Sequence, residues 1–80
     1  MRSVNIGIIG LGTVGGGVVR LIQRHHDDYV EHYGIDLKIK RACSRNDIEA
    51  ENLGIANVFT TNWQDITSDP TIDIVIELIG

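Results

Sequence analysis

The stretch Val4–Gly17, VNIGIIGLGTVGGG, decides the fold of this chain. It begins as a short apolar run, Val4–Ile9, passes through a glycine-rich turn, Gly10–Gly15, and continues at helical spacing. A strand, a G-x-G-x-x-G turn and a helix in that order are typical of dinucleotide-binding domains. The context therefore predicts a nucleotide site at this turn, rather than a turn that only joins a strand to a helix.

Each glycine of the turn has a separate task in this prediction. Gly10 allows the tight turn out of the strand, Gly12 lets a pyrophosphate approach the backbone, and Gly15 lets the helix pack closely on the strand. The free N–H groups of the first helical turn, at the positive end of the helix dipole, would receive the phosphates.

The composition limits the chain to one small globular domain. It has 80 residues, of which 42% are hydrophobic, and a net charge of −4. The acidic balance argues against a nucleic-acid partner, whereas a bound dinucleotide needs only local positive groups. The single cysteine, Cys43, excludes an intrachain disulfide and fits a reducing compartment. Without an apolar run of membrane-span length or a signal peptide, we expect a cytoplasmic location and no membrane partner.

The segment after the turn predicts a helix from about Thr13 to His26 or slightly beyond. A polar cluster follows, His25–Asp28 with Glu31 and His32, and we interpret it as the solvated end of this helix, closed by Gly34. We expect no metal site there, because the usual fixed ligand spacing is missing. Four apolar residues at i, i+4, i+7 and i+8 form the expected buried face: Val14, Val18, Leu21 and Ile22.

The rest of the chain predicts three further strands and two short helices. The strands are expected at Leu37–Cys43, Asn57–Thr60 and Ile72–Ile79. The first short helix begins at Asn46 as N-cap, with Glu49 completing a capping box, and ends near Leu53 and Gly54.

The second short helix is expected to start from Thr61 or Asn62 and to end before Pro70, since proline cannot continue a helix. Within it, Trp63 and Ile66 are expected to pack in the core rather than to form a stacking platform.

The alternation of these elements, βαβαβαβ, predicts an α/β fold with right-handed crossovers. We expect a partial Rossmann-type doubly wound parallel sheet in three layers, with strand order 3-2-1-4 and the glycine turn at its carboxyl edge. A complete domain of this type has two more strands beside the fourth. The fourth strand would therefore be an exposed apolar edge, and residues 1–80 are expected to be the N-terminal part of a larger protein.

The end of the second strand selects the cofactor in such domains. An acidic residue there binds the ribose hydroxyls of NAD, and an arginine accommodates the extra phosphate of NADP. This chain has Ser44 and Arg45 at that place, and the nearest acid, Asp47, is better explained by the first turn of the next helix. The sequence therefore favours NADP over NAD, the alternative being that Arg45 is an ordinary exposed side chain.

Two further polar residues are candidates for a role. Glu77 lies near the carboxyl end of the fourth strand, where it would contact the cofactor ribose, hold a nearby loop or partner a backbone or basic group. Cys43 is expected to be a small core residue, because no histidine is positioned to activate it as a nucleophile. No catalytic triad or acid–base pair for hydride transfer can be assembled from these residues.

Two segments, Ile6–Val18 and Asp73–Gly80, closely resemble the N-terminal cofactor domain of homoserine dehydrogenase. The motifs G-L-G-T-V-G-G-G and V-x-E-L-I-G carry this resemblance, which covers essentially the whole chain but only the first part of that enzyme. It implies NAD(P)-dependent interconversion of L-homoserine and L-aspartate 4-semialdehyde, on the way to threonine and methionine.

The resemblance also implies roles for particular residues. Leu11, Thr13, Val14 and Arg45 would contact the cofactor, and Glu77, Leu78 and Ile79 would line the wall near the nicotinamide end. In that family the catalytic lysine, the acidic residues that hold the small-molecule substrate and the dimerisation surface lie in a later domain. The chain is therefore expected to bind cofactor but to be inactive alone, and the full-length enzyme is expected to be a homodimer.

Two other hypotheses remain open at this point. One is a methyltransferase that binds S-adenosylmethionine at a similar turn, although such proteins usually carry an acid where this chain has Ser44 and Arg45. The other is a non-catalytic nucleotide-binding module.

Overall fold

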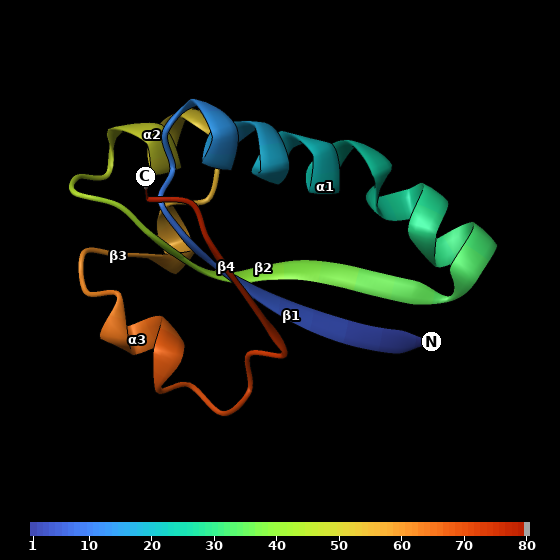
Figure 1. Cartoon of the computed structure of the whole chain (residues 1–80). Helices are drawn as coiled ribbons and strands as arrows, with labels where there is room; N and C mark the ends of the chain where they lie inside the picture. Colours follow the sequence, from blue (N-terminus) through green and yellow to red (C-terminus); the bar gives the residue numbers. More distant parts are fainter. Residues whose placement is uncertain (80) are drawn as a thin grey trace.

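A parallel sheet of four strands, in the order β3-β2-β1-β4, forms the centre of the computed structural model, which describes residues 1–79 (Figure 1). The elements follow one another as β1 (Arg2–Ile9), α1 (Thr13–Tyr33), β2 (Ile35–Cys43), α2 (Ile48–Asn52), the 3-10 helix η1 (Ala56–Val58), β3 (Phe59–Thr60), α3 (Gln64–Thr67) and β4 (Ile74–Glu77). The predicted strand order and the parallel pairing are confirmed.

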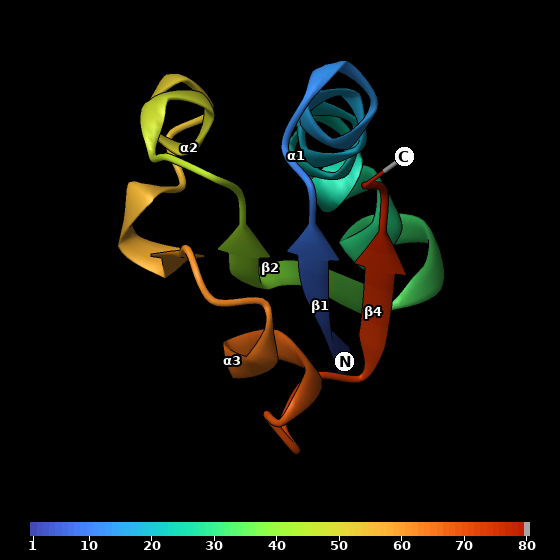
Figure 2. The same ribbon diagram turned by 60° about the vertical axis from the view of Figure 1, so that its left-hand side comes forward.

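The helices cover the two faces of the sheet unequally. Figure 2 shows α1 and α2 over one face and α3 over the other, which gives the three predicted layers. Residues of β1 alternate between these layers, because successive side chains of a strand point to opposite faces. The larger buried cluster, under α1 and α2, contains Ile6, Ile8, Leu11, Val19, Ala42, Ala50, Leu53 and Ile55; the smaller, under α3, contains Ile9, Cys43 and Ile66.

Helix α1 is longer than predicted, since it continues to Tyr33 rather than ending near His26. Gly34 then closes it in the left-handed conformation, with φ of 64°, and donates its N–H to the Val30 carbonyl at 3.1 Å. The interpretation of His25–Asp28 as a solvated helix end is therefore wrong, because these residues lie within the helix. Apolar periodicity ends near Ile22, but the polar second half remains helical and leads directly into β2.

The predicted buried face of α1 is also partly wrong. Val14 and Leu21 are 64% and 52% exposed, whereas Val18 and Ile22 pack against the core. The fully buried side chain is Val19, and Gly15 and Gly16 are buried beside it. The contact face is rotated toward these glycines, which let the helix approach the sheet.

A histidine–carboxylate pair joins the distal half of α1 to β2. His26 Nε2 lies 2.6 Å from Asp36 Oδ1, and Lys38 Nζ lies 3.3 Å from the other oxygen of Asp36. The hydrogen bond with Asp36, assisted by Asp27, raises the pKa of His26, and the bond with His26 lowers the pKa of Asp36. This pair joins two residues that are ten positions apart in the chain, one on α1 and the other on β2.

The pair makes the stability of the chain depend on pH. A raised histidine pKa stabilises the fold below its ordinary value of 6.5, and this stabilisation is lost as the pH rises through the raised pKa. A lowered aspartate pKa stabilises the fold above 3.8, and this is lost as the pH falls through the lowered pKa. His26→Ala should therefore reduce the thermal midpoint most between pH 3.8 and 6.5. His25→Ala, the same change one residue earlier, is the control; equal pH profiles of the two variants would contradict this expectation.

The later elements are shorter than predicted, and the N-caps of the two short helices are Asp47 and Trp63, one residue after the predicted Asn46 and Asn62. Asn46 Oδ1 accepts the Ile48 N–H at 3.1 Å, and Asn62 Oδ1 accepts the Gln64 N–H at 3.1 Å. The Glu49 half of the predicted capping box does not form in the part of the chain that the structure describes. Strands β3 and β4 have two and four residues, where the sequence predicted four and eight.

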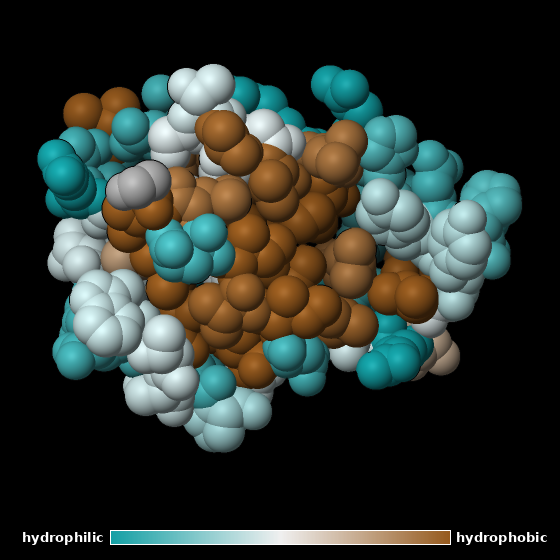
Figure 3. All heavy atoms as spheres, viewed as in Figure 1, coloured by the Kyte–Doolittle hydropathy of each residue, from teal (hydrophilic) through white to brown (hydrophobic). Residues whose placement is uncertain are grey.

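Strand β4 is the predicted apolar edge. It pairs with β1 alone among residues 1–79, and Ile74 and Val75 are 48% and 45% exposed. Figure 3 shows the apolar surface on this side of the molecule.

Across residues 1–79, no helix is both long enough and apolar enough to cross a membrane.

Candidate functional site

The glycine turn is tied to the strands on both sides of β1. Gly10 has φ of 105°, a conformation that favours glycine, and donates its N–H to the Cys43 carbonyl at 2.8 Å. On the other side, the Leu78 N–H donates to the Ile9 carbonyl at 2.8 Å. The turn therefore lies where the carboxyl ends of β1, β2 and β4 meet.

Gly15 brings the start of α1 against this turn. A Cβ atom at Gly15 would overlap the carbonyl oxygen of Gly10 and lie 2.9 Å from its carbonyl carbon. Both atoms belong to the backbone, so neither can move aside as a flexible side chain can. This contact explains why the third position of the motif carries a glycine.

Gly12 differs from Gly15, because open space surrounds its missing side chain. No atom of the described chain lies within 4 Å of a Cβ built at Gly12. Gly12 is the N-cap of α1 and makes no side-chain cap, and the first turn carries no acidic residue. The first helical turn therefore offers uncapped backbone N–H groups and a partial positive charge to an anion. The backbone at Gly12 is open to a group such as a phosphate.

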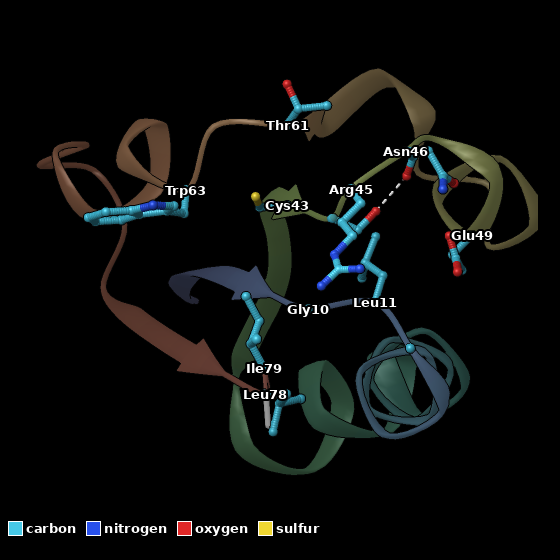
Figure 4. Close-up of a pocket in the computed structure, with 12 residues that line it drawn as sticks. Gly10, Leu11, Cys43, Arg45, Asn46, Glu49, Thr61, Trp63, Leu78 and Ile79 are labelled. Carbon is cyan, nitrogen blue, oxygen red and sulfur yellow. Dashed lines mark hydrogen bonds between the residues drawn. The ribbon is translucent and has the colours of Figure 1, made fainter.

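A pocket of about 400 Å³ opens beside this turn. Figure 4 shows that its walls come from the glycine turn, the segment after β2, the segment after β3 and the end of β4. Its lining residues are Gly10, Leu11, Gly12, Cys43, Ser44, Arg45, Asn46, Glu49, Thr61, Trp63, Leu78 and Ile79.

Among residues 1–79, Arg45 is the only cation that lines this pocket. Figure 4 places its guanidinium group beside Leu11, close to the glycine turn. No carboxylate of residues 1–79 forms an ion pair with it. Ser44, which precedes it, donates its hydroxyl hydrogen to the Asn46 carbonyl and so fixes the loop that carries Arg45. An unpaired guanidinium in a pocket is well suited to bind a phosphate.

A second hollow, of about 300 Å³, adjoins the pocket on the side of α2. The two share three residues: Leu11, Gly12 and Glu49. Thr13 and Arg20 line only this second hollow, which runs along the first turns of α1.

The end of β4 contributes an apolar wall to the pocket. Leu78 and Ile79 line it, whereas Glu77 does not. The Glu77 carboxylate instead accepts the Ile79 backbone N–H. Glu77 thus holds the backbone of this wall, which is one of the roles that the sequence left open. Gly80, the last residue of the V-x-E-L-I-G motif, lies outside the described residues.

The expectation that Trp63 packs in the core is wrong. Trp63 is 52% exposed and lines the pocket, while Ile66 on the following helix α3 is 1% exposed. The Thr60 hydroxyl donates to Asp65 at 2.6 Å and accepts the Asn62 N–H at 3.1 Å, which fixes the loop carrying Trp63. Helix α3 has four residues, and its buried residue Ile66 packs against the sheet with Ile9 and Cys43.

The structure brings together seven of the eleven residues that the sequence assigned to the cofactor. Those that line the pocket are Gly10, Leu11, Gly12, Ser44, Arg45, Leu78 and Ile79. Thr13 lines the adjoining hollow, Val14 is exposed, Gly15 lies buried under the turn, and Glu77 holds the wall. The sequence predicted no site role for the other five lining residues, which are Cys43 at the end of β2 and, after β2 or β3, Asn46, Glu49, Thr61 and Trp63.

The chemistry of the pocket is that of a binding site. Cys43 is buried, as predicted. Burial is the larger cause, and the negative charge of Asp65 the smaller cause, of the raised pKa of its thiol. The thiol therefore stays protonated. Within residues 1–79, no three histidine, cysteine or acidic side chains are grouped so that they would hold a metal ion. The free amides, the open Gly12 and the unpaired Arg45 instead fit a ligand that carries phosphates.

Comparison with known proteins is consistent with this geometry. The family model for the NAD-binding domain of homoserine dehydrogenase matches residues 10–80. The chain is 37% identical to the homoserine dehydrogenase of Bacillus subtilis, covering 100% of this chain and 19% of that enzyme. The crystal structure of Staphylococcus aureus homoserine dehydrogenase at pH 8.5 superposes on the whole chain with a TM-score of 0.90 and 32% identity, over 20% of its own length.

A second crystal structure, that of a homoserine dehydrogenase from Thiobacillus denitrificans, is 41% identical. It has a TM-score of 0.84 and covers 100% of this chain and 19% of its own. The chain therefore spans about a fifth of the length of the relatives it matches.

Proposed function

Because the chain belongs to the family of homoserine dehydrogenase NAD-binding domains, we propose that it binds a nicotinamide dinucleotide in the pocket beside the glycine turn. The observation that carries this proposal is the uncapped start of α1 next to the open backbone of Gly12. A helix N-terminus approached across a glycine receives a pyrophosphate in dinucleotide-binding domains of this topology.

In this proposal the parts of the pocket have different tasks. The backbone of Gly10–Gly12 and the first N–H groups of α1, those of Thr13 and Val14 included, hold the pyrophosphate. Ser44 and Arg45 face the adenosine ribose, since they follow β2. Leu78 and Ile79 exclude water at the nicotinamide end. Gly15 and Glu77 act as positioning residues, one under the turn and the other on the Ile79 backbone.

We propose NADP(H) as the favoured cofactor. Arg45 has no ion-pair partner among residues 1–79 and projects into the pocket, where the 2′-phosphate would neutralise it. A planar guanidinium matches a phosphate with two parallel hydrogen bonds, which a ribose hydroxyl cannot replace.

For the whole protein we propose the reversible oxidation of L-homoserine to L-aspartate 4-semialdehyde, by analogy with the matched enzymes. The bound nicotinamide ring would accept and return the hydride. This chain binds and orients the cofactor, and the substrate-binding, catalytic and dimerisation parts belong to the remaining four-fifths of the enzyme. We also propose a homodimer for the whole protein, and a reducing compartment such as the cytoplasm, which fits the free, buried Cys43.

Replacing Arg45 with alanine tests this proposal. We expect NADPH to bind at least about tenfold more weakly, since a hydrogen-bonded charge pair contributes about 1.5–3 kcal/mol. NADH binding should change by less than about threefold, because no phosphate faces Arg45 in that complex. Isothermal titration calorimetry of both cofactors measures the two affinities.

Arg41→Ala is the matched control, since Arg41 lies on β2, the strand that precedes Arg45, but outside the pocket, and the substitution removes the same charge. Equal losses of NADPH affinity in the two variants would mean that only net charge matters. Equal losses of NADPH and NADH in Arg45→Ala would contradict the 2′-phosphate role.

A further inference from the structure

A carboxylate faces the pocket that contains the unpaired arginine. Glu49 of α2 lines both the pocket and the adjoining hollow, so it lies at the boundary between them, together with Leu11 and Gly12. Figure 4 shows Arg45 and Glu49 on the same side of the glycine turn, one from the loop after β2 and the other from α2. A ligand phosphate held by Arg45 would therefore meet the charge of Glu49 as well.

The Glu49 side chain has no structural task in the described chain. It does not complete the capping box, because its carboxylate accepts no hydrogen bond from Asn46. Among residues 1–79 it forms no ion pair, and its side chain is half-buried. A carboxylate that has no ion-pair partner and lines a ligand pocket acts on a bound ligand through its charge.

We propose that Glu49 limits the preference of this site for NADP(H) over NAD(H). This inference rests on the proposed function, in which Arg45 receives the 2′-phosphate. The carboxylate repels that phosphate, and it has no such effect on the ribose hydroxyl of NAD(H), which is neutral and donates hydrogen bonds to acids. Cofactor preference at this site is then set by two opposed charges, Arg45 and Glu49, rather than by the arginine alone.

The size of the effect follows from Coulomb's law. The 2′-phosphate carries two negative charges and is repelled by the Glu49 carboxylate across a solvated pocket. This repulsion changes the affinity for NADP(H) about fivefold. Salt screens solvent-exposed charges, so the effect should shrink as the ionic strength rises toward 1 M. A steric effect of the side chain would not depend on salt.

Titrating Glu49→Gln with NADPH and NADH tests the inference. We expect NADPH to bind about fivefold more tightly at low salt and NADH to bind equally well or more weakly, so the ratio of the two affinities rises. Glu49→Lys should raise the ratio further. Glu51→Gln is the matched control, because it removes the same charge from the same helix outside both hollows. Circular dichroism establishes that each variant is folded.

The outcomes separate this inference from the proposed function. If the wild-type chain binds both cofactors and the ratio is the same in Glu49→Gln and Glu51→Gln, only the role of Glu49 is overturned. A rise in the ratio that persists at high salt would also contradict a charge effect. If the folded wild-type chain binds neither cofactor, both proposals fail.

Discussion

Gly15→Ala is expected to destabilise the chain by about 3 kcal/mol, at the upper end of the cost of overpacking. The added Cβ would overlap the Gly10 carbonyl oxygen, so the start of α1 must move away from β1. Total stability for 80 residues is about 4–12 kcal/mol, so this loss removes much of it. Urea unfolding followed by circular dichroism measures the change.

Gly17→Ala is the control for this experiment and should have the opposite sign. Gly17 lies on the exposed side of the same helix, and within residues 1–79 no atom beyond the local helix backbone lies within 4 Å of a Cβ built there. Alanine is favoured over glycine inside a helix by about 1 kcal/mol, so Gly17→Ala should stabilise the chain. Equal effects of the two substitutions would contradict the close packing at Gly15.

Gly12→Val is expected to reduce dinucleotide affinity at least about tenfold while it leaves the fold intact. The added side chain enters the open space beside the uncapped start of α1, where the pyrophosphate is proposed to approach. The backbone at Gly12 is extended, with φ of −67°, so valine fits there. Its poorer preference as an N-cap costs about 1 kcal/mol. NADPH and NADH should be affected alike, because both carry the same pyrophosphate.

The substitutions at Gly12 and Gly15 separate the two uses of one motif. Gly15 has backbone atoms against its missing side chain, and Gly12 has none within 4 Å. A substitution at Gly15 is therefore expected to lower the stability of the fold, and a substitution at Gly12 is expected to lower the affinity for the dinucleotide. These are the two different tasks that the motif predicts for Gly12 and Gly15.

Much of the fold could be predicted because local signals agree with one another. The apolar run before Gly10, the alternation of strands with helices and the asparagines at 46 and 62 all point to the observed topology. The length of α1 could not be predicted from apolar spacing, since its second half has no apolar stripe and is linked to β2 by the pair His26 and Asp36. This contact forms only when the chain has turned back from α1 into β2, and apolar spacing within the helix does not describe that turn.

The candidate site could be predicted only where its residues belong to a motif. The glycine turn and Arg45 have fixed places relative to β1 and β2, and both line the pocket. Trp63 and Glu49 were assigned to the core and to a capping box, because periodicity and capping rules describe a helix by itself. Their position at the pocket results from which side of the short helices α2 and α3 packs on the sheet.

The central claim, that this turn binds a dinucleotide, is tested most directly by calorimetric titration of the folded wild-type chain and Gly12→Val side by side. Gly17→Val adds the same side chain outside the site and serves as the control. We expect NADPH to bind the wild type and Gly17→Val, and to bind Gly12→Val at least about tenfold more weakly. S-adenosylmethionine should bind none of them. Unchanged NADPH affinity in a folded Gly12→Val, or tighter binding of S-adenosylmethionine to the wild type, would contradict the account.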